Sequence, residues 1–451
     1  MAVIGAGPAG LYAADILLGQ MPGAQIDVLE ALPTPFGLIR YGVAPDHPRI
    51  RSIIDSLHEI LDRGNVQFCG NITVGSDVTL DELRERYDLI VLATGALRDA
   101  DLELPGVGLP GSFGAADFVA WYDSHPDYSQ LWPLDAHSVA VIGNGNVALD
   151  IVRVLARRPE DLAKTDIPEH VSRAFADSPV RDIHVFGRRG PAAVKFSPLE
   201  LRELGQVPGV RMVLEARDFQ FDSADQAAMK ANGRLRQAVK TMEQWLARAG
   251  KGEAGADERR IHLHFYCRPE RIEGADKVTE LLVRRTAPDG LGGVVDTDEL
   301  RSFEVQAVYR AVGYFGSPVV GAPFDHGTGV VPNERGRVID PEGGVVPGLY
   351  ATGWIKRGPV GLIGSTKSDA LETVNSIVED LPRLRPAPLR QPEALTELLA
   401  ARGVQVVTWP GWLAIDAAER AAGQLQGRER AKLATRAELL RAALTESENM
   451  L

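Results

Sequence analysis

The sequence predicts an α/β protein built from two domains, each with a parallel sheet. The chain has 451 residues, and at roughly 150 residues per domain this is too long for one small core. An apolar strand, a glycine-rich turn and a helix follow one another twice, at residues 3–18 and 137–157. Three further apolar segments, 87–96, 307–314 and 348–354, run into glycine, as strands do at the carboxyl edge of a parallel sheet.

Composition excludes several classes of protein. Apolar residues make up 45% of the chain and charged residues 24%, which is typical of a globular protein. The 49 Lys and Arg against 61 Asp and Glu give a net charge of -12, which argues against nucleic-acid binding. No segment has the apolar length of a membrane span and the chain enters a strand directly, so we expect no membrane association and a cytoplasmic location.

Cysteine usage limits the chemistry. The only cysteines are Cys69 and Cys267, which form no CxxC pair and no disulfide framework. They also supply no cysteine set for a cluster or structural zinc, and we expect no metal site. Any redox chemistry then requires a bound cofactor.

The first glycine-rich turn is a dinucleotide-binding fingerprint. Gly5, Gly7 and Gly10 have GxGxxG spacing after a strand and at the head of an amphipathic helix. The first glycine makes the turn, the second lets a pyrophosphate approach the backbone, and the third allows close packing of helix on strand. The next strand, 24–30, ends at Glu30, where we expect the carboxylate to bind a ribose hydroxyl.

The second turn repeats this pattern with Gly143, Gly145 and Ala148. Its matching strand, 181–186, comes late because a helical or looping stretch from about 158 to 179 is inserted. We therefore expect a second nucleotide-binding fold.

The end of that strand carries the opposite charge. Arg188 and Arg189 stand where the first fold has Glu30, and paired arginines suit a 2′-phosphate better than a ribose hydroxyl. A solvated surface pair is the alternative interpretation. This contrast indicates FAD at the first site and NADP at the second.

The order of these segments predicts that one domain is inserted into the other. We expect residues 224–249 to be helical and residues 261–267 and 277–285 to be strands. The expected domains are 1–104 for the first part of the FAD domain, 105–318 for the NADP domain, and 319–451 for the second part of the FAD domain, with a C-terminal extension from about 382.

Four long segments, 32–53, 141–155, 186–204 and 353–374, strongly resemble the adrenodoxin reductase family, the NADPH–ferredoxin reductases of bacterial and mitochondrial type. The similarity runs from residue 1 to about 380 and returns near 414–423. The resemblance implies a glutathione-reductase-like fold with two Rossmann-like domains. It also implies that electrons pass from NADPH through FAD to a small iron–sulfur ferredoxin.

The resemblance also implies the residues that bind each cofactor. For FAD these are Gly5, Gly7, Ala9, Gly10, Glu30, Leu38, Val74, Trp354, Gly361, Leu362 and Ile363. For NADP they are Asn144, Gly145, Asn146, Val147, Arg188, Arg189, Glu200 and Gly361, with Gly361 facing the nicotinamide. The family often carries a further basic residue near the NADP after the 87–96 strand, and Arg98, slightly earlier than expected, is the candidate for this contact.

Hydride transfer needs alignment of the two cofactors more than an acid or a base. We expect a helix over 366–377 whose N-terminal N–H groups face the flavin. His47 is a candidate for moving a proton near the flavin, with Glu203 as its partner, although a hydrogen bond that fixes the loop explains His47 equally well. Trp354 either covers the ring system or packs in the core.

Glu200 has a structural alternative to NADP binding. The sequence SPLE makes Ser197 an N-cap and Glu200 the reciprocal partner in a capping box. Either role, or both in different states, is compatible with the sequence.

Ferredoxins are acidic, so a basic surface is expected even on an acidic reductase. The candidates are Arg40, Arg49, Arg51, Lys195 and Arg202. The sequence leaves the oligomeric state open, and a monomer is compatible with it.

Two other functions compete with a ferredoxin reductase. One is a glutamate-synthase-type small subunit that donates electrons to a large partner, although such subunits carry N-terminal cysteines that this chain lacks. The other is a non-enzymatic, flavin-bearing interaction protein that senses NADPH.

Overall fold

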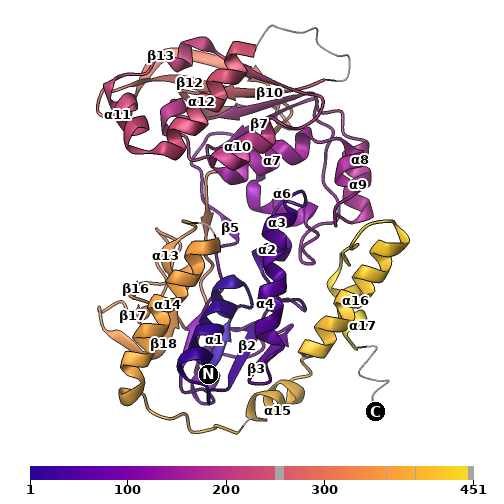
Figure 1. Cartoon of the computed structure of the whole chain (residues 1–451), viewed down its shortest axis with the longest axis vertical. Coiled ribbons are helices and arrows are strands. Elements are labelled where there is room, and N and C mark those ends of the chain that lie inside the picture. The colour runs from indigo at the N-terminus through magenta and orange to yellow at the C-terminus, as the bar shows by residue number, and fades with distance from the viewer. Residues whose placement is uncertain (249–257, 362, 392, 445–451) are drawn as a thin grey trace. The chain divides into compact units, whose positions relative to one another are not determined.

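A computed structural model describes residues 1–248, 258–361, 363–391 and 393–444. Their contacts divide the chain into two compact units, labelled by element in Figure 1. Unit 1 comprises Met1–Arg98, Asp123–Asp127 and Gly313–Leu451, and unit 2 comprises Asp99–Tyr122 and Tyr128–Val312. The chain thus leaves unit 1, builds unit 2 and returns.

Unit 1 is built on a seven-stranded sheet in the order β16-β17-β18-β4-β1-β2-β3. Strands β18, β4, β1, β2 and β3 are parallel, and β16 and β17 add an antiparallel edge. The strands of this sheet are β1 (Ala2–Ile4), β2 (Ile26–Glu30), β3 (Val66–Gly70), β4 (Ile90–Leu92), β16 (Asn333–Glu334), β17 (Arg337–Ile339) and β18 (Val345–Ala351). The short strands β5 (Arg98–Asp99) and β15 (Tyr314–Phe315) pair with each other. The helices are α1 (Pro8–Gln20), α2 (Leu38–Tyr41), α3 (Pro48–Arg51), α4 (Ile53–Leu61), α5 (Leu80–Arg84), α13 (Trp354–Arg357), α14 (Ile363–Asp380), the 3-10 turn Leu381–Arg383, α15 (Ala394–Ala401), α16 (Trp409–Leu425) and α17 (Arg436–Leu444).

Both faces of this sheet are buried, because successive side chains of a strand point to opposite faces. Val3 of β1 packs in one core with apolar residues of α1, α4, α14, α16 and α17. Ala2 and Ile4 pack in the other core with residues of α5 and α15. The short apolar strands expected from the sequence are therefore covered by helices on both sides.

Unit 2 has a six-stranded parallel sheet in the order β6-β14-β7-β8-β10-β9 and a three-stranded antiparallel sheet, β11-β12-β13. The strands are β6 (Ser112–Gly114), β7 (Ser138–Ile142), β8 (Asp182–Phe186), β9 (Val210–Leu214), β10 (Arg259–His264), β11 (Cys267–Glu273), β12 (Glu280–Pro288), β13 (Val294–Glu304) and β14 (Ala307–Arg310). The helices are α6 (Ala115–Tyr122), α7 (Asn146–Ala156), α8 (Pro159–Leu162), α9 (Glu169–Ala176), α10 (Pro198–Leu204), α11 (Ser223–Ala231) and α12 (Gly233–Arg248), with 3-10 turns at Pro191–Ala193 and Ala216–Phe219. Two units with parallel sheets confirm the predicted fold class.

The chain crosses between the units earlier than we expected. The contacts place the crossings after Arg98 and Val312, whereas the sequence suggested 104 and 318. Leu104 already packs in the unit 2 core, and Val319 packs in a unit 1 core. The short segment Asp123–Asp127 joins unit 1 because Asp123 binds Lys432 and Arg51.

Several expected elements differ in detail. The helix expected over 224–249 is two helices that meet at Asn232, and the strand expected over 261–267 is divided between β10 and β11. The strand expected over 277–285 is β12, and β13 was missed because its sequence, rich in Asp and Glu, lacks an apolar pattern. The helix expected from Thr366 begins at Ile363.

Candidate cofactor sites

The first glycine loop has the geometry that a bound pyrophosphate needs. Gly5 has a φ of 110°, and a Cβ there would lie 2.5 Å from the carbonyl oxygen of Ala93. A Cβ on Gly10 would lie 2.1 Å from the carbonyl oxygen of Gly5, so any side chain would separate α1 from β1. At Gly7, the only atom of the described residues within 4 Å of such a Cβ is the Cα of Gly37, at 3.9 Å, which leaves the backbone approachable.

The N-terminus of α1 is suited to an anion. No side chain caps it, and the first helical N–H groups, which include that of Ala9, lack partners within a helix. Together with the helix dipole they form an anion site. These features fit the pyrophosphate of a dinucleotide.

Glu30 ends β2 beside this loop. Its carboxylate accepts hydrogen bonds from the N–H groups of Ala6, at 2.8 Å, and Leu32, at 3.2 Å. Burial raises the pKa of Glu30, and the N–H donors oppose that shift. The backbone thus fixes the carboxylate at the strand end, where the fold places a ribose.

Two other loops bring Leu38 and Val74 to the same edge of the sheet. A Cβ on Gly37 would lie 3.1 Å from the Cα of Gly7, so the loop before Leu38 lies against the glycine turn. The N–H of Ile72 donates to the carbonyl of Glu30, so the segment leading to Val74 runs beside the end of β2. Sequence spacing alone gives no sign of either approach.

The turn after β18 carries Trp354. Gly353 has a φ of 77°, and a Cβ there would lie 2.5 Å from the Cβ of Ala9. Asp369 of α14 holds this turn, because its Oδ2 accepts from the Gly353 N–H at 2.6 Å and from the Thr352 hydroxyl at 3.2 Å. Asp369 was missed because nothing in its local sequence connects it with a partner 16 residues away. Trp354 is half-buried and stacks on Tyr314 with ring centroids 6.5 Å apart.

The second fingerprint has the same construction in unit 2. A Cβ on Gly143 would lie 2.3 Å from the carbonyl oxygen of Ala311, whereas nothing lies within 4 Å of one on Gly145. Asn146 begins α7 and Val147 follows it; Ala148, the third fingerprint position, is fully buried. The side chain of Asn144 lies against Gly187, which joins the glycine turn to the end of β8.

Arg188 and Arg189 follow β8 and are exposed. Their backbone is fixed, because the carbonyl of Arg188 accepts from the Thr286 hydroxyl at 2.7 Å and that of Arg189 accepts from the Tyr266 N–H at 3.2 Å. Both arginines line a cavity of about 380 Å³ whose other lining residues are Arg268, Thr286, Gly293, Val294 and Asp296. The wall formed by β11, β12 and β13 was missed in the sequence, since these strands follow the arginines by some 80 residues or more.

Glu200 does not complete the expected capping box. Ser197 caps α10 by accepting from the Glu200 N–H at 3.1 Å, but the Ser197 N–H donates to the Asn146 side chain instead. The carboxylate of Glu200 binds Arg153 at 3.1 Å, and the Arg153 side chain is fully buried. The reciprocal half of the capping box was therefore wrong, because a buried arginine competes for the carboxylate.

The predicted pair His47 and Glu203 is divided between the two units, so each residue is placed within its own unit. His47 lies in unit 1, is 7% exposed and ends the turn that starts at Ala44. Glu203 lies in unit 2 on α10 and is partly exposed. Their pairing stays a prediction. Arg98 is exposed, and its guanidinium lies over the Phe315 ring, 5.5 Å from the centroid.

The flavin segment after α13 is described in part. Gly361 has a φ of 90°, and Ile363 is the first residue of α14. Leu362 lies outside the described residues.

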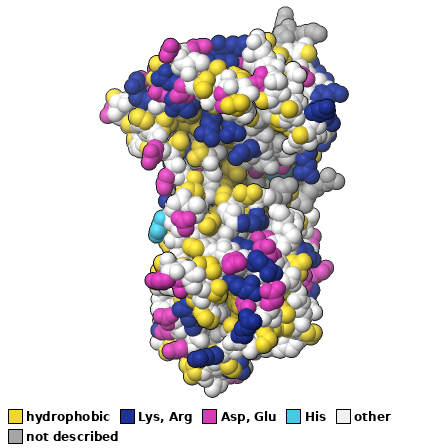
Figure 2. Space-filling model, turned by 90° about the vertical axis from the view of Figure 1, so that its left-hand side faces the viewer, with side chains coloured by type: hydrophobic (Ala, Val, Ile, Leu, Met, Phe, Trp, Pro, Cys, Tyr) yellow, Lys and Arg dark blue, Asp and Glu magenta, His cyan; other side chains and the backbone are white. Residues whose placement is uncertain are grey.

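The candidates for ferredoxin binding divide into two groups. Arg40 was a wrong choice, because it is 3% exposed and bound to Glu419. Arg51 is largely buried and binds Asp123 at 2.5 Å. Lys195 and Arg202 are exposed, whereas the side chain of Arg49 is outside the described set. On the face drawn in Figure 2, Lys and Arg side chains alternate with Asp and Glu over much of the surface.

Comparison with known proteins agrees with this geometry. The family model described as pyridine nucleotide-disulphide oxidoreductase matches residues 1–179.

Neither Cys69 nor Cys267 forms a disulfide in the structure, and both are buried. Among the described residues, we find no helix of the length and apolar character that crossing a membrane requires.

Curated relatives match over almost the whole chain. NADPH:adrenodoxin oxidoreductase of Arabidopsis thaliana mitochondria is 38% identical, covering 98% of this chain and 94% of the relative. NADPH-ferredoxin reductase FprA of Mycobacterium tuberculosis is 40% identical, covering 98% and 99%. The solved structure of M. tuberculosis FprA in complex with NADPH superposes with a TM-score of 0.91 at 39% identity, covering 98% and 99%. The chain belongs to the adrenodoxin reductase family of NADPH–ferredoxin reductases.

Proposed function

We propose that this chain is an NADPH–ferredoxin reductase that passes electrons from NADPH through FAD to a one-electron iron–sulfur ferredoxin. The contrast between the two fingerprints carries the proposal: Glu30 ends the second strand of unit 1, and Arg188 and Arg189 follow the corresponding strand of unit 2. Family membership supports it, since the relatives named above are NADPH-dependent reductases of ferredoxin or adrenodoxin.

The residues of unit 1 fit FAD. The open backbone at Gly7 and the uncapped start of α1 hold the pyrophosphate, and Glu30 orients a ribose. Asp369 fixes the turn that carries Trp354, and α14 begins at Ile363, so its N-terminus places the positive end of a helix dipole there. When bound, FAD accepts a hydride and releases electrons singly.

The residues of unit 2 fit NADPH. Gly145 leaves its backbone open to the pyrophosphate, and the two arginines provide charge-assisted donors for the 2′-phosphate. We assign Asn144, Asn146, Val147 and Glu200 to the same site. Orientation, rather than proton transfer, is the contribution of this unit.

The decisive experiment measures cytochrome c reduction by the purified, FAD-loaded protein with NADPH, with and without an acidic ferredoxin. We expect rapid bleaching of the flavin by NADPH and sustained turnover only when ferredoxin is present. Bleaching without turnover across several ferredoxins would instead indicate the flavin-bearing NADPH sensor. The absence of bleaching would contradict both functions.

A glutamate-synthase-type electron donor is not favoured, because the relatives named above are reductases of ferredoxin or adrenodoxin. The cytoplasmic location expected from the sequence stays a prediction.

A further inference from the structure

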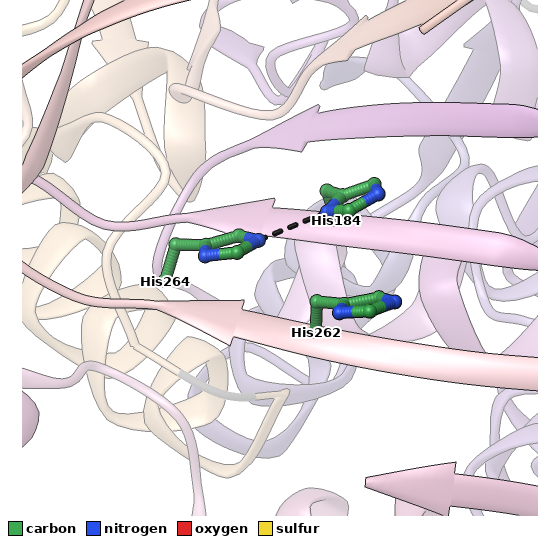
Figure 3. A group of neighbouring side chains, drawn as sticks. All are labelled: His184, His262 and His264. Atoms are coloured by element: carbon green, nitrogen blue, oxygen red, sulfur yellow. Dashed lines mark hydrogen bonds between the residues drawn. The ribbon is translucent and has the colours of Figure 1, made fainter. Parts of the chain in front are cut away.

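Three histidines lie together on one face of the unit 2 sheet, away from the fingerprint residues in sequence. His262 and His264 alternate along β10, so their side chains point to the same face. His184 of β8 is the register partner of His262 in the parallel pairing. One ring nitrogen of each histidine lies within 4.8 Å of the corresponding nitrogens of the other two (Figure 3).

The nitrogens that face the cluster are close to a coordinating arrangement. Nδ1 of His184 and Nε2 of His264 are 2.9 Å apart, joined by the hydrogen bond drawn in Figure 3. Two imidazole nitrogens on a tetrahedral zinc ion, each about 2.0–2.1 Å from the metal, are about 3.3 Å apart. Small rotations of the rings therefore suffice to replace this hydrogen bond with two metal bonds.

The outer nitrogens have acidic neighbours, as those of metal-bound histidines commonly do. Nε2 of His262 is hydrogen-bonded to Asp182 at 2.7 Å, which leaves Nδ1 for an ion. Nδ1 of His264 is buried and lies 3.8 Å from a carboxylate oxygen of Glu215. Each of these two histidines thus has a carboxylate on the side away from its ligand nitrogen.

The surroundings select the kind of ion. Arg260 binds Asp182, and Arg217 and Arg301 bind Glu215, so these carboxylates bring little net negative charge. The atoms that face the cluster are imidazole nitrogens, one from each of the three histidines. Neutral nitrogen ligands suit zinc and its neighbours in the transition series, whereas magnesium and calcium require oxygen.

We propose that His184, His262 and His264 form a binding site for a divalent transition-metal ion, zinc above all. The sequence expectation of no metal site considered cysteine sets alone, whereas alternating histidines in IHLHF are also a ligand pattern on a strand. Phe303 covers part of the cluster, with its ring centroid 4.7 Å from that of His264, and His262, 18% exposed, leaves a route for the ion. The ion would tie β8 to β10 shortly before the end of β8, which Arg188 follows.

Calorimetric titration of the chelator-treated, untagged, full-length protein with zinc tests this site. We expect one tight equivalent, lost with His184→Gln or His264→Gln. His326→Gln, which changes an exposed histidine in unit 1, is the matched control and should bind as the unchanged protein does. The proposal would be overturned if the control variant lost zinc affinity, or if the two cluster variants bound zinc as tightly as the unchanged protein.

A second variant leaves every ring in place. Asp182→Asn should weaken zinc binding about 10- to 100-fold, because it removes the carboxylate that orients His262. The same zinc concentration should raise the thermal midpoint of the unchanged protein and of His326→Gln, and should raise that of Asp182→Asn less. If the unchanged protein takes up no tight equivalent, the three rings are a packed core cluster and the site does not exist.

Discussion

At the scale of single residues, one position distinguishes two otherwise similar folds. Glu30 is fixed by the N–H groups of Ala6 and Leu32, so its charge is fixed beside the loop. Arg188 and Arg189 have fixed backbones but exposed side chains that line a cavity. The difference matches the two ligands: a hydroxyl needs one oriented acceptor, and a phosphate needs several charged donors.

Replacing Arg188 and Arg189 together with alanine should separate the two nicotinamide nucleotides. Each charge-assisted hydrogen bond contributes about 1.5–3 kcal/mol, so NADPH affinity should fall about 100-fold or more, with little change for NADH. Steady-state KM and direct titration with both nucleotides measure this. Arg234→Ala, on the exposed side of α12, is the control. Equal losses for NADPH and NADH would contradict the 2′-phosphate assignment.

The sequence predicted residues whose role depends on local spacing, such as Gly5, Gly10, Glu30 and Arg188. It did not predict partners that only the fold brings together. Arg153 is the clearest case, since its buried guanidinium takes the Glu200 carboxylate that local spacing assigned to a capping box. Arg40 is another case. Its segment is basic and looks like a loop in the sequence, but the side chain is buried and paired with Glu419, far along the chain.

At the scale of elements, helix α1 contains two glycines with opposite requirements. A Cβ on Gly10 meets the Gly5 carbonyl at 2.1 Å, whereas nothing lies within 4 Å of one on Gly19. Replacing each glycine with alanine therefore separates the effect of close packing, at Gly10, from the effect of helix propensity, at Gly19.

Gly10→Ala should lower the free energy of unfolding by about 1–3 kcal/mol or more, because helix and strand must separate. Gly19→Ala should raise it by about 0.5 kcal/mol, because alanine loses less backbone entropy in a helix. Thermal unfolding with and without FAD checks both. If the two variants behave alike, close packing of α1 on β1 is not what requires Gly10.

An acid with a shifted pKa, Asp99 of β5, binds the N-terminus of helix α6. Asp99 accepts from the Ala116 N–H at 3.0 Å, and burial, aided by repulsion from Asp117, raises the pKa of Asp99 to about 6. Because the folded-state pKa exceeds the unfolded value of 3.8, this group's stabilising contribution is complete below about pH 4 and is lost as the pH rises through 6.

Asp99→Asn should therefore stabilise the protein by up to about 3 kcal/mol at pH 7.5 and change little at pH 4. Denaturant unfolding followed at both pH values measures the difference. Asp298→Asn, at an exposed acid on β13, is the matched control for the substitution itself. A stabilisation of the same size at both pH values would exclude a raised pKa as the cause.

At the scale of the whole molecule, the C-terminal extension is part of unit 1 and not an appendage. Glu419 of α16 is fully buried and binds Arg40 and Arg430, while Lys432 binds the carbonyl of Arg40 and the carboxylate of Asp123. The sequence predicted a C-terminal extension from about 382, but it did not predict this anchoring, since the paired charges of Arg40 and Glu419 are 379 residues apart.

Glu419→Gln should destabilise unit 1 by about 3–5 kcal/mol, since it leaves buried arginines without a countercharge. Hydrogen exchange followed by mass spectrometry should show faster exchange in α16, α17 and the segment around Arg40, with unit 2 unchanged. Glu429→Gln, with a side chain 83% exposed, is the control. If hydrogen exchange became faster to the same extent in both units, Glu419 would not act by anchoring the C-terminal extension to unit 1 alone.

The divided course of unit 1 also sets an order of events during synthesis. Ile90 of β4 pairs with Leu349 of β18, which a ribosome adding about 5–20 residues per second reaches roughly 13–50 s later. All the strands of unit 2 emerge in that interval. The nascent FAD domain therefore waits with β4 as an unpaired edge, a site where strands of other chains can add, and we expect a chaperone to protect it until β18 arrives.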